Sequence, residues 1–105
     1  MVRGDVHAIT LPRRRGHVQR GRRYAVIVQA DALLALSTVV ICPTSLSAFP
    51  ASFHPEIAIH DQPTQVLCEM IGAVDARALG DRVGHLTLAE QRSLDDALQL
   101  VLDIS

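Results

Sequence analysis

The chain has 105 residues, 49% of them hydrophobic and 20% charged, with a formal net charge of −1. These values exclude a disordered chain and allow one domain with one modest core. The charge is unevenly placed, because residues 1–23 hold seven Arg against one Asp and residues 24–105 hold three Arg against ten acidic residues. A uniformly basic nucleic-acid-binding surface is therefore excluded, and a local anion-binding site near the N-terminus is favoured.

The N-terminal part of the chain predicts two strands joined by a basic loop. Residues 4–11 alternate loosely between the two faces of a strand, and Pro12 ends this first element. Residues 13–22 are rich in arginine and contain two glycines, which is typical of a loop. Residues 23–29 are apolar on both faces and predict a second, central strand.

The middle of the chain predicts two more strands and a long loop. Asp31 caps a short helical turn of Ala and Leu, and residues 38–45 predict a β-branched third strand that Pro43 stops. Residues 45–55 contain two prolines and small side chains, which indicates a loop. Residues 56–60 alternate cleanly, as expected of a half-buried strand.

The C-terminal part predicts further strands and one long helix. Residues 64–75 predict a long or bent strand, and residues 82–86 predict a short strand or a turn. A helix is predicted over residues 87–104, because Thr87 and Glu90 form a capping-box pattern. The residues at helical spacing are Leu88, Gln91, Leu94, Leu98, Val101 and Leu102. Several short strands with one closing helix predict a mainly β fold, a small barrel with the helix against it.

The cysteines, the histidines and the N-terminus indicate which kinds of site and segment are not expected in this protein. Cys42 and Cys68 lack zinc-ligand spacing, so we expect both to be buried and reduced in a cytoplasmic protein. His54 and His60 are not at helical ligand spacing, so no metal site is expected. The N-terminus lacks the apolar segment of a signal peptide, and no apolar run is long enough to span a membrane.

Three separated segments carry side chains that could meet at one functional site. The candidates are polar or charged residues at strand ends or in the basic loop: Arg22, Arg23, Thr44, Ser45, Glu69, His7 and His17. Taken singly, each also fits a plainer interpretation. Loop arginines are commonly solvated, and a Thr-Ser pair after proline is commonly a turn with side-chain-to-backbone hydrogen bonds.

Taken in order, these motifs resemble the MazF/PemK family of toxins. The resemblance rests on "RGDV" at the first strand, a glycine-containing loop ending in "GRRYAVIVQ", then "VVICPTS", "TQVLCEMIGAVDARALGDRVGHL" and the terminal helix. It runs from about Arg3 to Ile104 with compatible spacings. It implies a single toxin domain over residues 1–105, folded as an SH3-like small β-barrel with a C-terminal α-helix.

The resemblance also implies an activity. Members of this family are toxins of type II toxin–antitoxin systems and cut single-stranded RNA at short sequences without a metal or another cofactor. The 2′-hydroxyl attacks the adjacent phosphate and leaves a 2′,3′-cyclic phosphate and a 5′-hydroxyl. The expected partners are RNA (mRNA, tRNA or rRNA), a cognate MazE-like antitoxin, and a second copy of the chain in a homodimer; a membrane is not among them.

The family's best-marked functional residues are carried over to two strand positions. Its arginine at the second strand corresponds to Arg23, which implies proton transfer and charge stabilisation. Its threonine after the third strand corresponds to Thr44, which implies a hold on the scissile phosphate. The residues expected to bind RNA are Arg13, Arg14, Arg15, Gln19, Arg20, Arg22 and Ser45.

The acid and base of the reaction are less clearly marked. His17 matches a histidine of the plasmid-type branch, and Glu69 stands at the aspartate of that branch's Arg-x-Asp pair, so both are candidate catalytic residues. Val18 stands where members carry glutamate, and Leu67 stands where that branch carries arginine. These departures leave open which group serves as acid and which as base.

Two other functions stay open at the level of sequence. The missing loop glutamate and late-strand arginine allow a catalytically weakened member that acts as a binding or regulatory module. A gyrase inhibitor of the CcdB type shares the fold but relies on a C-terminal tryptophan motif, and this chain has no Trp. RNA turnover separates the nuclease from both alternatives.

Overall fold

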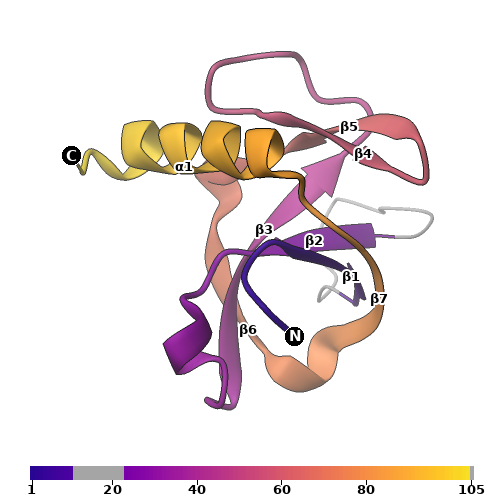
Figure 1. Cartoon of the computed structure of the whole chain (residues 1–105), viewed down its shortest axis with the longest axis vertical. Helices are drawn as coiled ribbons and strands as arrows, with labels where there is room; N and C mark the ends of the chain where they lie inside the picture. Colours follow the sequence, from indigo (N-terminus) through magenta and orange to yellow (C-terminus); the bar gives the residue numbers. More distant parts are fainter. Residues whose placement is uncertain (11–22, 105) are drawn as a thin grey trace, which may run out of the picture.

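The computed structural model describes residues 1–10 and 23–104, and Figure 1 shows a curled sheet with one helix along one side. The strands of the described part are β1 (Asp5–Ile9), β2 (Arg23–Ile27), β3 (Thr38–Ser45), β4 (Glu56–Ile59), β5 (Gln62–Val66), β6 (Gly72–Asp75) and β7 (Leu79–His85). The helices are the short 3-10 helices η1 (Asp31–Leu33), η2 (Cys68–Met70) and η3 (Ala76–Ala78), and the long α1 (Leu88–Leu102).

The sheet is antiparallel and is organised around β3. Its strand order is β4-β5-β3-β2-β1-β7, and β6 also pairs with β3. Every pair of strands runs antiparallel. The predicted fold class, mainly β with a small barrel-like sheet and a C-terminal helix, is confirmed.

Strand β3 continues through Pro43, so the prediction that this proline ends the strand is wrong. The Pro43 carbonyl accepts a hydrogen bond from Leu67 N at 2.8 Å, on the edge of β3 away from β2. On that edge the pairing with β6 ends at Ile41 and the pairing with β5 begins at Thr44. Because β3 changes neighbours there, no ladder bond needs the N–H that proline lacks.

The long strand predicted over residues 64–75 is divided in two. Strand β5 ends at Val66, η2 follows, and β6 begins at Gly72. The division has a topological cause, since β5 pairs with the end of β3 and β6 pairs with its beginning. Helix η2 carries the chain between these two partners and buries Cys68 against the core.

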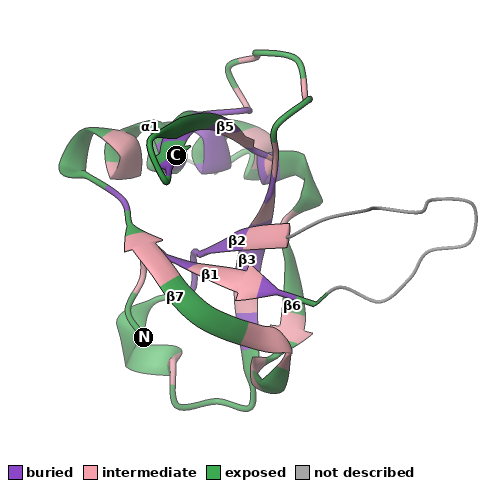
Figure 2. Cartoon of the chain, turned by 90° about the vertical axis from the view of Figure 1, so that its right-hand side faces the viewer, coloured by how far each residue is buried: buried purple, intermediate pink, exposed green. Residues whose placement is uncertain are grey.

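Both faces of the sheet carry buried apolar side chains, and Figure 2 shows the burial along β2 and β3. Val26 belongs to the cluster that packs against Leu94 of α1. Ala25 and Ile27, which point to the other face, belong to a second cluster with Ile41. The prediction that the second strand is central and apolar on both faces is confirmed.

Helix α1 begins with the predicted capping box. The Thr87 hydroxyl accepts from Glu90 N at 3.1 Å, and the Glu90 carboxylate accepts from Thr87 N at 2.8 Å. The packed stripe is narrower than the spacing predicts: Leu94 and Leu98 are buried, but Leu88 is 65% exposed.

The N-terminal segment ties β1 to the helix and to β7. The Arg3 guanidinium donates to Val28 O at 3.1 Å and to Asp95 Oδ1 at 2.8 Å. Asp5, only 2% exposed, accepts from Arg82 Nε at 2.9 Å, and its Oδ1 lies 2.8 Å from His85 Nδ1. This buried carboxylate therefore joins the first and last strands of the sheet.

Cys42 and Cys68 are buried thiols that form no disulfide, as predicted. The hydrogen bond between them, together with burial, raises the pKa of the Cys42 thiol. A raised pKa keeps this thiol protonated and unreactive. In the described residues, no helix has both the length and the apolar character needed to cross a membrane.

Candidate functional site

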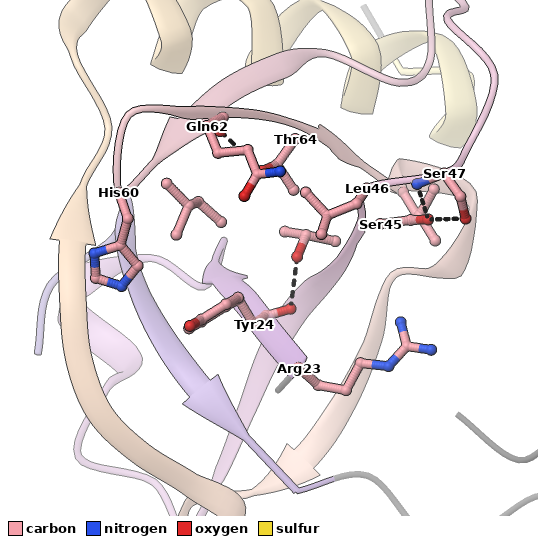
Figure 3. Close-up of a pocket in the computed structure, with 11 residues that line it drawn as sticks. Arg23, Tyr24, Ser45, Leu46, Ser47, His60, Gln62 and Thr64 are labelled. Atoms are coloured by element: carbon pink, nitrogen blue, oxygen red, sulfur yellow. Dashed lines mark hydrogen bonds between the residues drawn. The ribbon is translucent and has the colours of Figure 1, made fainter. Parts of the chain in front are cut away.

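A cavity of about 360 Å³ opens where the start of β2, the end of β3 and the β4–β5 hairpin meet (Figure 3). Its polar lining residues are Arg23, Tyr24, Thr44, Ser45, Ser47, His60, Gln62 and Thr64. No carboxylate lines it within the described part of the chain, so its fixed charge there is the Arg23 guanidinium. A cavity of this kind favours an anionic ligand.

Arg23 is the first residue of β2 and is paired with Ile9 of β1. This pairing gives its backbone the fixed position that the sequence predicted for an arginine at a strand end. Its Nε is buried, and no described residue accepts a hydrogen bond from it. A buried donor without an acceptor costs about 1–3 kcal/mol, which an incoming phosphate or carboxylate oxygen can recover.

Thr44 lies beside Arg23 in the same cavity and is held by three strands. Its backbone pairs with Val66 of β5, and its hydroxyl donates to Tyr24 O of β2 at 3.2 Å. The residue is only 4% exposed. Arg23 and Thr44, separated by twenty positions in the sequence, are therefore brought together as predicted.

Ser45 also lines the cavity and closes the turn after β3. Its Oγ accepts from Ser47 N at 3.2 Å and from Ala48 N at 3.1 Å, as Figure 3 shows in part. This is the turn with side-chain-to-backbone bonds that the sequence offered as the plainer interpretation of the Thr-Ser pair. The turn fixes the mouth of the cavity and leaves Thr44 as the buried member of the pair.

Glu69 lies outside the cavity lining and is bound to His54. Both His54 ring nitrogens face acceptors, because Nδ1 lies 2.8 Å from Phe49 O and Nε2 lies 2.6 Å from Glu69 Oε2. Burial disfavours the charged ring, but the Phe49 carbonyl and the Glu69 carboxylate outweigh it, so the pKa of His54 is raised. The structure thus separates Glu69 from Arg23 and Thr44.

The rest of the predicted site falls on the segment between β1 and β2. These residues are Arg13, Arg14, Arg15, His17, Gln19, Arg20 and Arg22, and they lie outside the described residues. Their roles stay predictions. Among the described residues, no group of three His, Cys, Asp or Glu side chains could hold a metal ion.

The sequence did not single out the hairpin residues that line the cavity. His60 and Asp61 form a two-residue connection between β4 and β5 and have φ values of 51° and 61°. Such turns usually carry Asn-Gly or Asp-Gly, so His-Asp gives no turn signal. The available clue was the spacing of two alternating segments around this pair, which would have placed His60 at a hairpin tip.

The chain matches one family of known proteins along nearly its whole length. A model of the family described as "PemK-like, MazF-like toxin of type II toxin-antitoxin system" matches residues 2–102. The chain belongs to this toxin family. A candidate toxin of Mycobacterium tuberculosis is 33% identical over 106 residues, which cover 99% of each of the two chains. The resemblance found in the sequence is therefore confirmed.

Solved structures of MazF toxins share the fold of this one. The Mycobacterium tuberculosis toxin MazF-mt6 has a TM-score of 0.81 at 17% identity, covering 96% of this chain and 98% of that one. An endoribonuclease from a mycobacterial species, solved with its cognate antitoxin, has a TM-score of 0.80 at 21% identity, covering 100% and 97%. At these identities the likeness shows the fold alone.

Proposed function

We propose that this MazF-family toxin is a metal-independent, sequence-specific endoribonuclease that cleaves single-stranded RNA. The 2′-hydroxyl attacks the adjacent phosphate, and the products carry a 2′,3′-cyclic phosphate and a 5′-hydroxyl. Family membership supports the reaction class, and the mycobacterial structure of the same fold is that of an endoribonuclease.

The observation that carries the proposal is that Arg23 and Thr44 line the same cavity, which favours an anion. The attack places an additional negative charge on the oxygens around phosphorus, and a fixed guanidinium beside them stabilises this charge. Arg23 also hydrogen-bonds the departing 5′-oxygen. Thr44 turns its hydroxyl hydrogen from Tyr24 O to a phosphate oxygen and so fixes the scissile group.

The remaining predicted site residues have different roles in the proposed reaction. The basic segment, with its arginines and Gln19, attracts the RNA backbone, and His17 stays a candidate for proton transfer. Glu69 was predicted as catalytic, but its place outside the lining and its bond to His54 support a positioning role instead. In that role Glu69 holds the residues between β3 and β4.

The proposed partners are RNA, a cognate antitoxin of the MazE type and a second copy of the chain. An antitoxin with an acidic segment would be attracted to the Arg23 guanidinium of the cavity and to the arginine-rich sequence before it, which supports competition with RNA. A related mycobacterial endoribonuclease was solved with its cognate antitoxin. Exposed apolar side chains at the end of α1, Leu100, Leu102 and Ile104, support self-association.

A second function, a binding module with little turnover, is favoured by one observation. Within the described residues, the cavity lining holds no carboxylate that could serve as a base. The alternative predicts RNA or antitoxin binding without cleavage. Measurement of turnover separates it from the nuclease.

The test is incubation of the purified protein with mixed single-stranded RNA in EDTA, followed by mapping of both cut ends. Wild type is expected to cut at one short sequence and to leave 5′-hydroxyl ends. Arg23→Ala and Thr44→Ala are expected to lose about 100-fold or more of the rate. Arg77→Ala is the matched control, since Arg77 is exposed, paired with Asp75 and absent from the cavity lining. A folded wild type that cuts no RNA, or variants that cut as well as wild type, would overturn the proposal.

A further inference from the structure

The proposed cleavage requires a proton acceptor for the 2′-hydroxyl, and among the described residues Arg23, Thr44 and Glu69 do not supply one. Arginine has donors only, so Arg23 cannot take a proton. The Thr44 hydroxyl is bonded to a backbone carbonyl, and so is that of Thr64, which donates to Gln62 O at 3.1 Å. The Glu69 carboxylate is held by His54 away from the cavity. Among the described residues the acceptor must therefore be another group, whereas His17 lies outside them.

Among the described histidines, His60 is the one that lines this cavity. Imidazole is the side-chain group best suited to take up a proton near neutral pH. The other three histidines of the described chain are committed through Nδ1: His7 to Gly80 O, His54 to Phe49 O and His85 to Asp5. His60 instead contacts the ring of Tyr24 in an edge-to-face arrangement, with ring centroids 6.1 Å apart and planes at 70°. This contact orients the imidazole at the cavity wall.

The hairpin turn sets the backbone conformation at His60. Its φ of 51° and the φ of 61° at Asp61 lie in the left-handed region, which a two-residue hairpin turn requires and which His and Asp adopt more readily than most residues. The side chain of His60 is exposed at this hairpin tip. The hairpin presents the ring to the cavity by means of this conformation.

His60 and Arg23 lie on opposite sides of the cavity, with Tyr24 between them, as Figure 3 shows. In-line attack at phosphorus places the entering and departing oxygens on opposite sides of the reacting atom. A base on one side and a fixed positive charge on the other match this requirement. Resting on the proposed function, we infer that His60 is the general base of the RNA cleavage.

The proposed cleavage needs water as its only other reactant, because every proton that is taken up is also returned. Neutral His60 takes the proton of the 2′-hydroxyl while the 2′-oxygen forms its bond to phosphorus. The bond from phosphorus to the 5′-oxygen breaks, and that oxygen leaves while hydrogen-bonded to Arg23 and takes a proton from water. The imidazolium then returns its proton to the solvent, which restores the neutral base.

The test compares His60→Asn with wild type, because asparagine tolerates the left-handed turn but does not titrate. We expect kcat to fall by about 100-fold or more, as for loss of a general base. In wild type, kcat/KM should rise with pH as the imidazole loses its proton, and this rise should vanish in the variant. Asp61→Asn is the matched control, since Asp61 shares the turn but does not line the cavity.

A second variant, His60→Gly, tests the same role by chemical rescue. Glycine suits the positive φ, and added imidazole should restore the rate in proportion to its concentration. If His60→Asn keeps the wild-type pH profile, or if only KM changes and imidazole rescues nothing, His60 is not the base although the nuclease stands. If wild type itself cuts no RNA, the proposed function fails and this inference fails with it.

Discussion

His54 Nε2 lies 2.6 Å from Glu69 Oε2, and this contact joins the loop before β4 to the helix η2. The second ring nitrogen lies 2.8 Å from Phe49 O, and the Phe49 and Phe53 rings pack around the imidazole. The loop is therefore fixed by a histidine whose two ring nitrogens both face acceptors, and these acceptors raise the pKa of His54.

His54→Gln is expected to lower the free energy of unfolding by about 1–3 kcal/mol at acidic to neutral pH. The pKa of His54 is raised in the folded protein. Its contribution is therefore full below the ordinary histidine value, about 6.5, and is lost as pH rises through the raised value. Urea unfolding at several pH values between about 5 and about 9 measures this contribution. Glu69→Gln should reduce the same pH dependence. Identical pH dependence in all three proteins would show that the pair does not stabilise the loop.

Asp5 predicts a second pH dependence, at acidic pH. Burial would raise its pKa, but hydrogen bonds from Val2 N, Arg82 and His85 outweigh burial and lower it from 3.8 to about 2. At pH values above the ordinary pKa of 3.8, the ionised Asp5 stabilises the folded protein by about 2 kcal/mol. This stabilisation is lost as the pH falls through the lowered pKa of about 2. Asp5→Asn should lose it at neutral pH, whereas Asp81→Asn, exposed on the same sheet, should not. Equal unfolding free energies for both variants would contradict this role.

Two substitutions at Thr44 separate the effect of its hydroxyl from the effect of its side-chain shape. Thr44→Val removes the hydroxyl that donates to Tyr24 O and nearly keeps the side chain's volume, whereas Thr44→Ser keeps the hydroxyl. We expect Thr44→Val to lose about 1 kcal/mol of stability and at least about tenfold in kcat/KM. Thr44→Ser should keep most of the activity. Single-turnover cleavage and thermal unfolding measure both quantities, and a fully active valine variant would remove Thr44 from the site.

The basic segment predicts a salt-dependent affinity for RNA. The logarithm of the RNA-binding constant should fall linearly with the logarithm of the salt concentration. Each arginine that contacts a phosphate of single-stranded RNA should make this slope steeper by about 0.7. Replacing Arg13, Arg14 and Arg15 with alanine should lower the slope by about 2 and weaken binding to all sequences alike. Fluorescence anisotropy at several salt concentrations measures the slope. An unchanged slope would show that these three arginines do not contact the backbone.

The sequence predicted β3 and α1 well because their signals are local. Residues 38–45 are a β-branched apolar run, and Thr87 with Glu90 specify a helix start by their own side chains. It missed the break at η2 because burial alternates from Thr64 through Val66 to Cys68, as it would in one continuous strand. The break depends on which part of β3 each strand pairs with, and this is not written in the local pattern.

The candidate site was predictable where a residue's role follows from its strand. Arg23 begins β2 and Thr44 is the last residue but one of β3, and pairing of these neighbouring strands brings both to one cavity. The position of Glu69 was not predictable, because it depends on His54, fifteen residues away across a loop and a hairpin. His60 was missed for a similar reason, since its place depends on a turn with an unusual residue.

Attack by the 2′-hydroxyl can be tested with an RNA that carries a single 2′-deoxy substitution at the nucleotide before the cut. The protein is incubated in EDTA with this RNA and with the unsubstituted RNA of the same sequence. We expect cleavage of the unsubstituted RNA to a 2′,3′-cyclic phosphate and a 5′-hydroxyl, and no cleavage at the substituted position. Cleavage at the substituted position at an equal rate would contradict attack by the 2′-hydroxyl.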